Sequence, residues 1–226
     1  MRDKIAVAVD GPSGAGKSTL SKSAAAELGI LYVDTGAMYR TVACAVAERG
    51  ISPQDEAGVS ALLPELSVAM RYGEDGLQHM FLNGRDCTDD IRKPEISAYA
   101  SAVSRFPAVR SFLLERQRSL ARESSVIMDG RDIGTVVLPK AEVKIFLTAP
   151  LEKRAERRFR ELRERGTPQT LEMVREEMRK RDADDAARML APLKPAEDAV
   201  VLDTGDLSFA ESREALLRLI RRVWEA

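Results

Sequence analysis

One stretch of the 226-residue chain constrains its fold more than any other. Residues 11–18 read Gly11-Pro12-Ser13-Gly14-Ala15-Gly16-Lys17-Ser18 and match G-x-x-x-x-G-K-[ST] at every fixed position. Residues 4–10 before it form a short, small-apolar run typical of a strand buried on both faces. Residues 17–28 after it have a helical pattern that ends at Gly29. Between such a strand and such a helix, a glycine-rich turn points backbone N–H groups at phosphate oxygens, so we expect a nucleoside triphosphate site.

The rest of the chain alternates between strand-like and helical segments. Further apolar runs typical of buried strands fall at residues 30–33, 125–129, 142–148 and 199–203. Further helical patterns cover residues 36–49, 94–122 and 207–225, with Pro107 placed to start a second helix inside the middle one. This order predicts an α/β fold with a central parallel sheet of five strands flanked by helices.

Two segments depart from this alternation. Residues 64–92 show strand-like alternation around turns at residues 73–76 and at Asn83-Gly84, which predicts a small inserted antiparallel β lobe. Residues 151–190 carry 12 basic and 10 acidic side chains and are interrupted at Gly166-Thr167-Pro168. A helical pair that polar is either a salt-bridged surface or a mobile lid. We expect one domain spanning residues 1–226, with the lobe and the lid as parts of it.

Composition excludes several classes of protein. With 35 basic against 36 acidic residues the net charge is −1, which argues against a protein that grips nucleic acid by bulk electrostatics. No apolar run approaches the length of a membrane span, and the first residues lack a signal-peptide pattern, so we expect a soluble, cytoplasmic protein. Cys44 and Cys87 lack a CxxC spacing and are expected to be reduced and structural. The single histidine, His79, excludes a His-based triad and a multi-His metal site.

The phosphate loop, residues 11–18, leaves open where the terminal phosphoryl group goes. A switch GTPase needs the base-reading motif N-K-x-D, which the sequence lacks. An ATPase motor usually has four apolar residues followed by Asp-Glu, and neither 125–129 nor 142–148 fits that pattern. A kinase for a small acceptor therefore remains, and its rival from another class is a nucleotide-dependent regulatory binder without an acceptor.

The first acceptor-side candidate is residues 34–40, which read DTGAMYR at a strand-to-helix junction. Carboxyl ends of strands are where open α/β sheets bind ligands. Arg40, one turn into the helix, is placed to reach an acceptor phosphate, and Thr35 lies at the junction itself. The alternatives are that Thr35 is only the N-cap of the helix and that Arg40 is only a solvated helix residue.

The second candidate is residues 128–135, which read MDGRDIGT directly after a predicted buried strand. Arg131 and Asp132 would be delivered to the same sheet edge as the phosphate loop. A plain surface turn explains Gly-Arg-Asp alone, but explains less well a strand that delivers acid, base and acid into one crevice.

Together with their order and spacing, four stretches carry a resemblance to a known family. GPSGAGKST, DTGAMYR, DGRDIGTVV and RDADDAARMLAPL, within residues 4–203, resemble the bacterial cytidylate kinases, which are P-loop nucleoside monophosphate kinases. The resemblance implies the P-loop kinase fold, with the inserted lobe as an enlarged monophosphate-binding region. It also implies transfer of the γ-phosphoryl group of ATP to CMP or dCMP, with Mg²⁺, in pyrimidine nucleotide metabolism.

Carried over residue by residue, the resemblance implies a role for each matching position. The expected catalytic residues are Lys17, Arg131 and Arg181. The expected ATP-binding residues are Gly11, Pro12, Ser13, Gly14, Ala15, Gly16, Lys17, Ser18, Thr19 and Arg157, with Ser18 as the candidate Mg²⁺ ligand. The expected CMP-binding residues are Thr35, Arg40, Arg131 and Arg181 near the phosphate, Ser101, Arg110 and Asp132 at the cytosine edge, and Asp185 and Arg188 at the sugar hydroxyls.

The chemistry of cytosine supports those roles. Its edge presents an N4 amino donor beside the acceptors N3 and O2, so a carboxylate such as Asp132 next to donors such as Arg110 and Ser101 complements it. Uracil reverses that edge, and UMP should therefore be a poor substrate. From pattern alone, Ser101 can equally be a helix-packing residue and Arg110 a solvated one.

Three residues of the lid repeat at helical spacing. Arg181, Asp185 and Arg188 fall at i, i+4 and i+7, which places them on one face of a continuous helix. The alternative is that Asp182, Asp184 and Asp185 form a surface salt-bridge ladder with Arg181 and Arg188. Kinases on the same scaffold for UMP, AMP or shikimate remain the closest rivals in function, and we expect a monomer.

Overall fold

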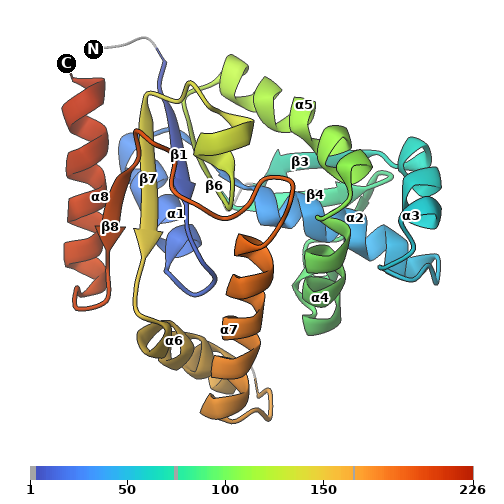
Figure 1. Cartoon of the computed structure of the whole chain (residues 1–226). Helices are drawn as coiled ribbons and strands as arrows, with labels where there is room; N and C mark the ends of the chain where they lie inside the picture. The colour runs from blue at the N-terminus through green and yellow to red at the C-terminus, as the bar shows by residue number, and fades with distance from the viewer. Residues whose placement is uncertain (1–3, 74–75, 165, 226) are drawn as a thin grey trace. The chain divides into compact units, whose positions relative to one another are not determined.

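The computed structural model describes residues 4–73, 76–164 and 166–225 (Figure 1). Its described residues form two compact units. Unit 1 comprises the residues up to Tyr32 and those from Glu123 onward, and unit 2 comprises Val33–Arg122. Within the described part of the chain, no helix is long and apolar enough to cross a membrane.

The central sheet has five strands, as predicted. Its order is β2-β6-β1-β7-β8, and the paired strands β1, β6, β7 and β8 run parallel (Figure 1). The strands are β1 (Ala6–Asp10), β2 (Leu31–Asp34), β6 (Val126–Gly130), β7 (Val143–Thr148) and β8 (Val200–Asp203). Because β1 lies in the middle of the sheet, the loop that follows it opens at the centre of the sheet's carboxyl edge.

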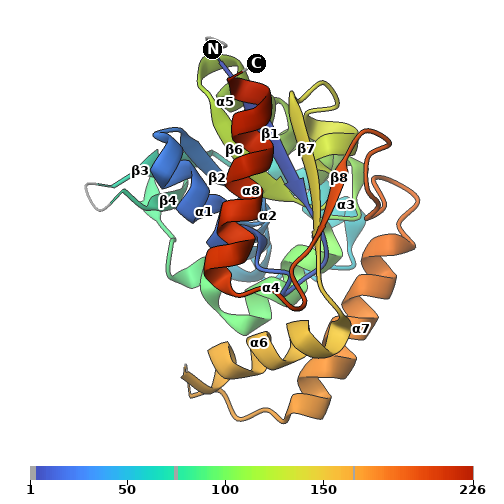
Figure 2. The same cartoon turned by 90° about the vertical axis from the view of Figure 1, so that its left-hand side faces the viewer.

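Helices α1 (Lys17–Leu28) and α8 (Phe209–Trp224) cover one face of this sheet (Figure 2). Alternate strand residues face them, and the resulting core is apolar. It includes Val7, Val9, Ile127, Ile145, Leu147, Leu20, Ala24, Leu216, Leu217 and Ile220. Helix α8 begins with a capping box in which Ser208 and Glu211 bind each other's backbone N–H groups. The two helices thus hold the strands that carry the phosphate loop.

The predicted lid is a pair of helices, α6 (Leu151–Glu164) and α7 (Leu171–Ala186), separated by the break at Gly166-Thr167-Pro168. An apolar seam joins them, formed by Ala155, Leu162, Val174 and Met178. Helix α7 ends at Ala186, so Arg188 lies beyond it. The expectation that Arg181, Asp185 and Arg188 share one face of a continuous helix is therefore wrong at Arg188.

Unit 2 contains a separate three-stranded antiparallel sheet in the order β3-β4-β5, which confirms the predicted insertion. Its strands are β3 (Val68–Tyr72), β4 (Gln78–Leu82) and β5 (Arg85–Asp86). Asn83 and Gly84 have φ of 50° and 83°, the left-handed pair that a tight hairpin turn needs. Glu74 and Asp75 of the other predicted turn lie outside the described residues.

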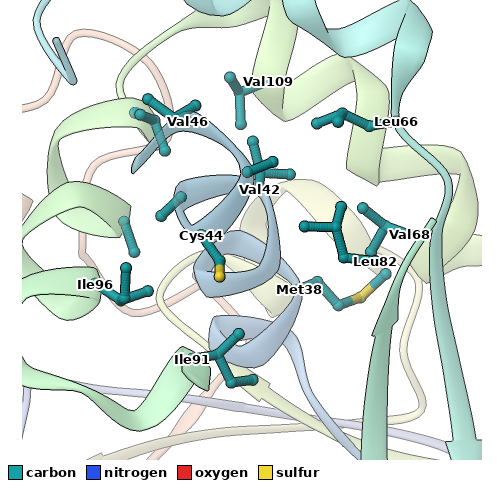
Figure 3. Close-up of a cluster of buried hydrophobic side chains, with 14 of the residues drawn as sticks. Met38, Val42, Cys44, Val46, Leu66, Val68, Leu82, Ile91, Ile96 and Val109 are labelled. Carbon is teal, nitrogen blue, oxygen red and sulfur yellow. The ribbon is translucent and has the colours of Figure 1, made fainter. Parts of the chain in front are cut away.

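The helices of unit 2 are α2 (Thr35–Glu48), α3 (Glu56–Leu62), α4 (Pro94–Val103) and α5 (Pro107–Glu123). Apolar side chains surround α2, and Figure 3 shows Met38, Val42 and Val46 among those of the neighbouring elements. Cys44 and Cys87 are buried free thiols, as predicted. Burial raises the pKa of Cys44 to about 11, so the thiol stays protonated and serves packing.

Candidate active site

The two predicted loops leave the same edge of the sheet. In the register of β1 and β6, Val9 pairs with Asp129 and Asp10 pairs with Gly130. Both strands therefore end side by side, and the residues after them, from Gly11 and from Arg131, begin at adjacent points. This is the arrangement that the sequence predicted for a triphosphate loop beside a second charged loop.

The phosphate loop requires glycine where it passes β7. Gly11 has φ of 148°, and a Cβ atom there would lie 1.9 Å from the carbonyl oxygen of Leu147. Gly16, with φ of 91°, precedes the first residue of α1 and offers no side chain to cap the helix. The first-turn N–H groups of α1 are therefore left for an anion, together with the positive end of the helix dipole.

Lys17 is the centre of a buried cationic cluster. It is 7% exposed, and its Nζ donates to the carbonyl oxygen of Pro12 at 2.8 Å. Burial, with the charges of Arg131 and Arg181, lowers its pKa to about 7, although the carboxylates of Asp129 and Asp10 act in the opposite direction. The other two predicted catalytic residues thus lie within electrostatic range of Lys17. An anion bound among them relieves the repulsion between them.

Ser18 and Asp129 bring two oxygen ligands together. The Ser18 hydroxyl donates to Oδ2 of Asp129 at 2.7 Å, and the Tyr32 hydroxyl lies 3.4 Å from the same oxygen. Asp129 is 2% exposed. Carboxylate and hydroxyl oxygens suit Mg²⁺, which is usually held by one or two carboxylates, substrate phosphates and water. The residues present therefore fit a Mg²⁺ site.

Asp10 ties the two loops together. Its two carboxylate oxygens accept the backbone N–H groups of Ile133 at 2.7 Å and Gly134 at 2.8 Å. These residues begin a π-helical turn, Ile133–Val137, directly after Arg131 and Asp132. Burial raises the pKa of Asp10 to about 6, and the nearby Asp132 carboxylate contributes to the rise. The last residue of β1 thus fixes the backbone that carries two predicted CMP-binding residues.

Asp185 connects the second loop to the lid. It is 1% exposed, accepts from Nε of Arg131 at 2.9 Å and forms a second ion pair with Arg188. Asp185 and Arg188 are therefore paired, as the salt-bridge alternative proposed, but the pair is buried instead of lying on the surface. A carboxylate has about four lone-pair positions, so these two pairs leave acceptor capacity at Asp185.

A different arginine of α6 contacts the phosphate loop. Arg154, 7% exposed, donates to the carbonyl oxygens of Ala149 at 2.8 Å and Ser13 at 3.0 Å, and to Asp182 at 2.6 Å. Arg157, the arginine expected from the sequence, donates instead to Thr204. Five arginines occur on α6 with no local signal to separate them, so only the structure identifies Arg154.

Asp34 organises the first turns of α2, where Thr35 and Arg40 lie. Its side chain accepts from the N–H of Ala37 at 3.0 Å and from Nη2 of Arg40 at 2.7 Å. Asp34 is therefore the N-cap of α2, and the alternative that Thr35 is the N-cap is wrong. Thr35 is the first residue of the helix and is 3% exposed. The ion pair with Asp34 orients the Arg40 guanidinium.

Ser101 on α4 and Arg110 on α5 are linked through Ser104. The Ser104 hydroxyl donates to the carbonyl oxygen of Ser101 at 2.9 Å, and Nη1 of Arg110 donates to the carbonyl oxygen of Ser104 at 3.2 Å. The Arg110 guanidinium also lies over the Tyr39 ring, 5.8 Å from its centroid. These contacts link the backbone of Ser101 to the side chain of Arg110 through Ser104.

The predicted residues thus form two groups, each described within its own unit. Unit 1 gathers the phosphate loop, Arg131, Asp132, Arg157, Arg181, Asp185 and Arg188. Unit 2 gathers Thr35, Arg40, Ser101 and Arg110. Sequence reasoning assigned no role to Asp10, Arg154 or Thr204, and it noted Asp129 only as the first acid of residues 128–135, without a partner or a metal role. Asp10 and Asp129 had a usable signal, because each is an acid at the end of a buried strand immediately before a glycine.

Comparison with known proteins gives a consistent result. The family model for cytidylate kinase matches residues 7–222. A cytidylate kinase of Caldicellulosiruptor bescii is 48% identical over 220 residues, covering 97% of each chain. One from Oceanobacillus iheyensis is 44% identical over 220 residues, covering 97% of this chain and 95% of its own. In fold, the chain resembles the crystal structure of an uncharacterized protein from Eubacterium ventriosum, with a TM-score of 0.50, 12% identity, and coverage of 96% and 98%.

Proposed function

Because the chain belongs to the cytidylate kinase family, we propose that it transfers the γ-phosphoryl group of ATP to CMP or dCMP and yields ADP with CDP or dCDP. The observation that carries the proposal is the buried Lys17 within range of Arg131 and Arg181 at a glycine-rich loop. Membership of this family does not favour the rival acceptors UMP, AMP and shikimate.

The main barrier to this reaction is the repulsion between two anionic phosphates. Phosphoryl transfer needs little covalent help from a protein, so alignment and charge neutralisation dominate. In our proposal Lys17, Arg131 and Arg181 spread the charge that develops during transfer. The attacking oxygen belongs to an already ionised phosphate, so no strong general base is needed. This fits a chain whose single histidine, His79, pairs with Asp86 on the antiparallel sheet of unit 2.

In the proposed site, the Ser18 hydroxyl and the Asp129 carboxylate would hold Mg²⁺. When bound, the ion would supply positive charge that offsets part of the charge on the ATP phosphates. The Asp129 carboxylate, 2.7 Å from the Ser18 hydroxyl oxygen, fixes the direction in which that oxygen points. Tyr32 adds a contact to the same carboxylate and restricts it further.

We assign the acceptor contacts by chemistry. Arg40, Arg131 and Arg181 would bind the CMP phosphate, with Thr35 nearby. Arg131 has five N–H donors, and its bonds to Asp185 and to the Gly130 carbonyl oxygen use only two of them. The remaining donors suit a bidentate contact to phosphate.

The cytosine and sugar would be read by the other candidates. Asp132 accepts from the N4 amino group, while Arg110 and Ser101 supply donors to the rest of the cytosine edge. Asp185 and Arg188 bind the sugar hydroxyls. A uracil edge would leave the Asp132 carboxylate poorly paired, which we expect to cost about 1–3 kcal/mol.

The lid would close during turnover. In our proposal α6 and α7 move over the bound nucleotides and exclude water that would otherwise hydrolyse ATP. We also propose that the protein works as a monomer in the cytoplasm, on free nucleotides.

A coupled ADP-release assay with ATP and Mg²⁺ tests the proposal. The acceptors are CMP, dCMP, UMP, AMP, dTMP and shikimate, each at a concentration that saturates its own kinase. We expect fast turnover with CMP and dCMP, slow turnover with UMP, and background rates with the others. Fast turnover with AMP but not with CMP would overturn the acceptor. Turnover with none of them, although ATP binds, would instead favour a regulatory binder.

A further inference from the structure

Thr204 occupies a junction within unit 1 that the proposed chemistry does not explain. It directly follows β8 and is 1% exposed. Its N–H donates to the carbonyl oxygen of Thr148, the last residue of β7, at 2.9 Å. The backbone of Thr204 therefore extends the pairing of β7 and β8 to the carboxyl edge of the sheet.

The side chain of Thr204 reaches two further elements. Its Oγ1 lies 3.4 Å from the carbonyl oxygen of Ala15 in the phosphate loop and 3.2 Å from that of Thr148. Nη1 of Arg157 on α6 donates to the same Oγ1 at 3.2 Å. Because arginine can only donate, it uses a lone pair of the hydroxyl, and the single hydroxyl proton is directed to one of the two carbonyl oxygens.

Arg157 makes a second bond to the same residue. Its Nη2 donates to the carbonyl oxygen of Thr204 at 2.6 Å. Two N–H groups of one planar fork, bound to two oxygens of one residue, fix both the position and the plane of the guanidinium. Arg157 is therefore held at a defined place beside the phosphate loop, although most residues of α6 are exposed or half-buried.

The other contact restrains the loop itself. Ala15 stands between Gly14 and Gly16, whose φ values are 71° and 91°. Glycines have the widest conformational freedom, so a loop built on them needs contacts from outside to keep one shape. The Thr204 hydroxyl lies 3.4 Å from the Ala15 carbonyl oxygen, and its proton supplies such a contact whenever it is directed there instead of to Thr148, 3.2 Å away.

We propose that Thr204 is a positioning residue for the donor nucleotide, which acts by fixing Arg157 and the phosphate loop at Ala15 in one arrangement. The inference rests on the proposed function in taking residues 11–18 as the site of the triphosphate and Arg157 as an ATP-binding residue. It is independent of which acceptor the enzyme uses.

The direct test is Thr204→Val, which removes the hydroxyl and keeps the shape. We expect the dissociation constant of Mg·ATP, measured by calorimetry without acceptor, to rise about 10-fold, because a hydrogen bond to a charged group is lost. The KM for CMP should stay within about 2-fold, because the acceptor contacts are untouched. Thr204→Ser, which keeps the hydroxyl, should restore ATP binding to within about 3-fold of the wild type. Unchanged ATP binding in Thr204→Val, or equal losses for ATP and CMP, would overturn the proposal.

Ser208→Ala is the matched control. It removes another hydroxyl from the segment between β8 and α8, where Ser208 only caps α8. We expect a lower melting temperature and unchanged ATP binding. If both variants weaken ATP binding in proportion to their loss of stability, the role of Thr204 is structural.

A double-mutant cycle with Arg157→Lys tests the route through Arg157. Lysine keeps the charge but loses the two hydrogen bonds to Thr204, so the single variant Arg157→Lys should already bind ATP more weakly. This result is informative even if Thr204→Val fails to fold. Adding Thr204→Val to Arg157→Lys should then raise the dissociation constant of Mg·ATP by a smaller factor than Thr204→Val does in the wild type. If the two factors simply multiply in the double variant, Thr204 does not act through Arg157. A protein that binds ATP but does not phosphorylate CMP would contradict the proposed function and leave this test intact, because it measures ATP binding.

Discussion

The two units bury different kinds of residue. In unit 1 six charged residues are at most 7% exposed, namely Asp10, Lys17, Asp129, Asp132, Arg154 and Asp185. Over the described residues, unit 2 buries no charged side chain, and its buried polar residues are the neutral Thr35, Thr41, Ser104 and Gln117. Its charges pair instead where water reaches them, as Arg85 does with Glu48 and Asp90.

This difference indicates that buried charged residues contribute to function in unit 1 and buried apolar residues to stability in unit 2. Burying a charge is costly unless bonds compensate for it, and even paired buried charges seldom add net stability. Two of these charges are cations and four are carboxylates, so the set is better explained by the proposed contacts to ATP, Mg²⁺ and CMP than by stability. The apolar core around α2 in unit 2 contributes stability directly. Substitutions in the two regions should consequently separate activity from stability.

The largest expected effect on activity is that of Lys17→Met. Turnover should fall by at least about 10²–10³-fold, the usual loss when one preorganised charge contact to the transition state is removed. The unliganded protein should not lose stability, because burial already disfavours the Lys17 ammonium. Steady-state kinetics and thermal unfolding measure the two quantities. Lys22→Met, at an exposed position of the same helix, is the control and should change neither. If the melting temperature fell by several degrees in Lys17→Met but not in Lys22→Met, Lys17 would have a structural role.

A similar but smaller separation is expected for Arg181→Ala. Its charge acts on Lys17 in the unliganded protein, so removing it relieves repulsion while it weakens charge neutralisation during transfer. We expect turnover to fall about 10²-fold, with stability nearly unchanged. The control is Arg179→Ala, whose side chain is exposed and pairs with Glu176 on the same helix. Equal losses of turnover and stability would show that Arg181 is structural.

The opposite outcome is expected for Leu82→Ala in the core of unit 2 (Figure 3). Leu82 is 4% exposed, and truncation should cost about 2–5 kcal/mol of unfolding free energy. Turnover, measured well below the melting temperature, should stay within about 3-fold of the wild type. Chemical denaturation gives the first quantity and the ADP-release assay the second. If Leu82→Ala had normal stability but poor turnover, the claim that the core of unit 2 serves stability and not activity would be wrong.

The last prediction concerns the pH dependence of stability. The folded-state pKa of Lys17, about 7, lies below its unfolded value of 10.5. Between these values the unfolded chain binds the proton that the folded protein releases, so unfolding free energy rises with pH by at most about 1.4 kcal/mol per pH unit. For Asp10 the folded pKa, about 6, lies above the unfolded 3.8, so its contribution falls as pH rises from about 4 to 6.

Denaturation of the unliganded protein at pH 7–9.5 measures the first of these slopes. Lys17→Met should flatten it, and Leu82→Ala should keep it at a lower overall stability. A slope that persists in Lys17→Met must arise elsewhere in the chain.

Much of this structure follows from local patterns. The five strands, the helices that alternate with them, the antiparallel insertion and the turn at Asn83-Gly84 were all predictable. Each is encoded within a few residues, by runs of β-branched side chains, helical periodicity, or glycine where φ is positive. The phosphate loop was predictable for the same reason, since Gly11 permits the close approach to Leu147 that no other residue tolerates.

The pairing of charged side chains was not predictable. Arg154 and Arg157 lie three residues apart on α6, yet one binds Ser13 and Asp182 and the other binds Thr204. Likewise, Asp185 pairs with Arg131 from 54 positions away, and Ser18 with Asp129 from 111. Local patterns carry no information about such partners, because the partners come together only when the strands pair and the helices pack on the sheet.

The sequence by itself therefore determined the fold class, the family and the loop that we propose binds phosphate. Only the tertiary structure decided which carboxylates and hydroxyls hold that loop in place: Asp10, Asp129 and Thr204. The physical reason is range. Backbone preferences act over one or two turns of chain, whereas a buried polar group must find its partners across the whole packed unit, where water no longer supplies them.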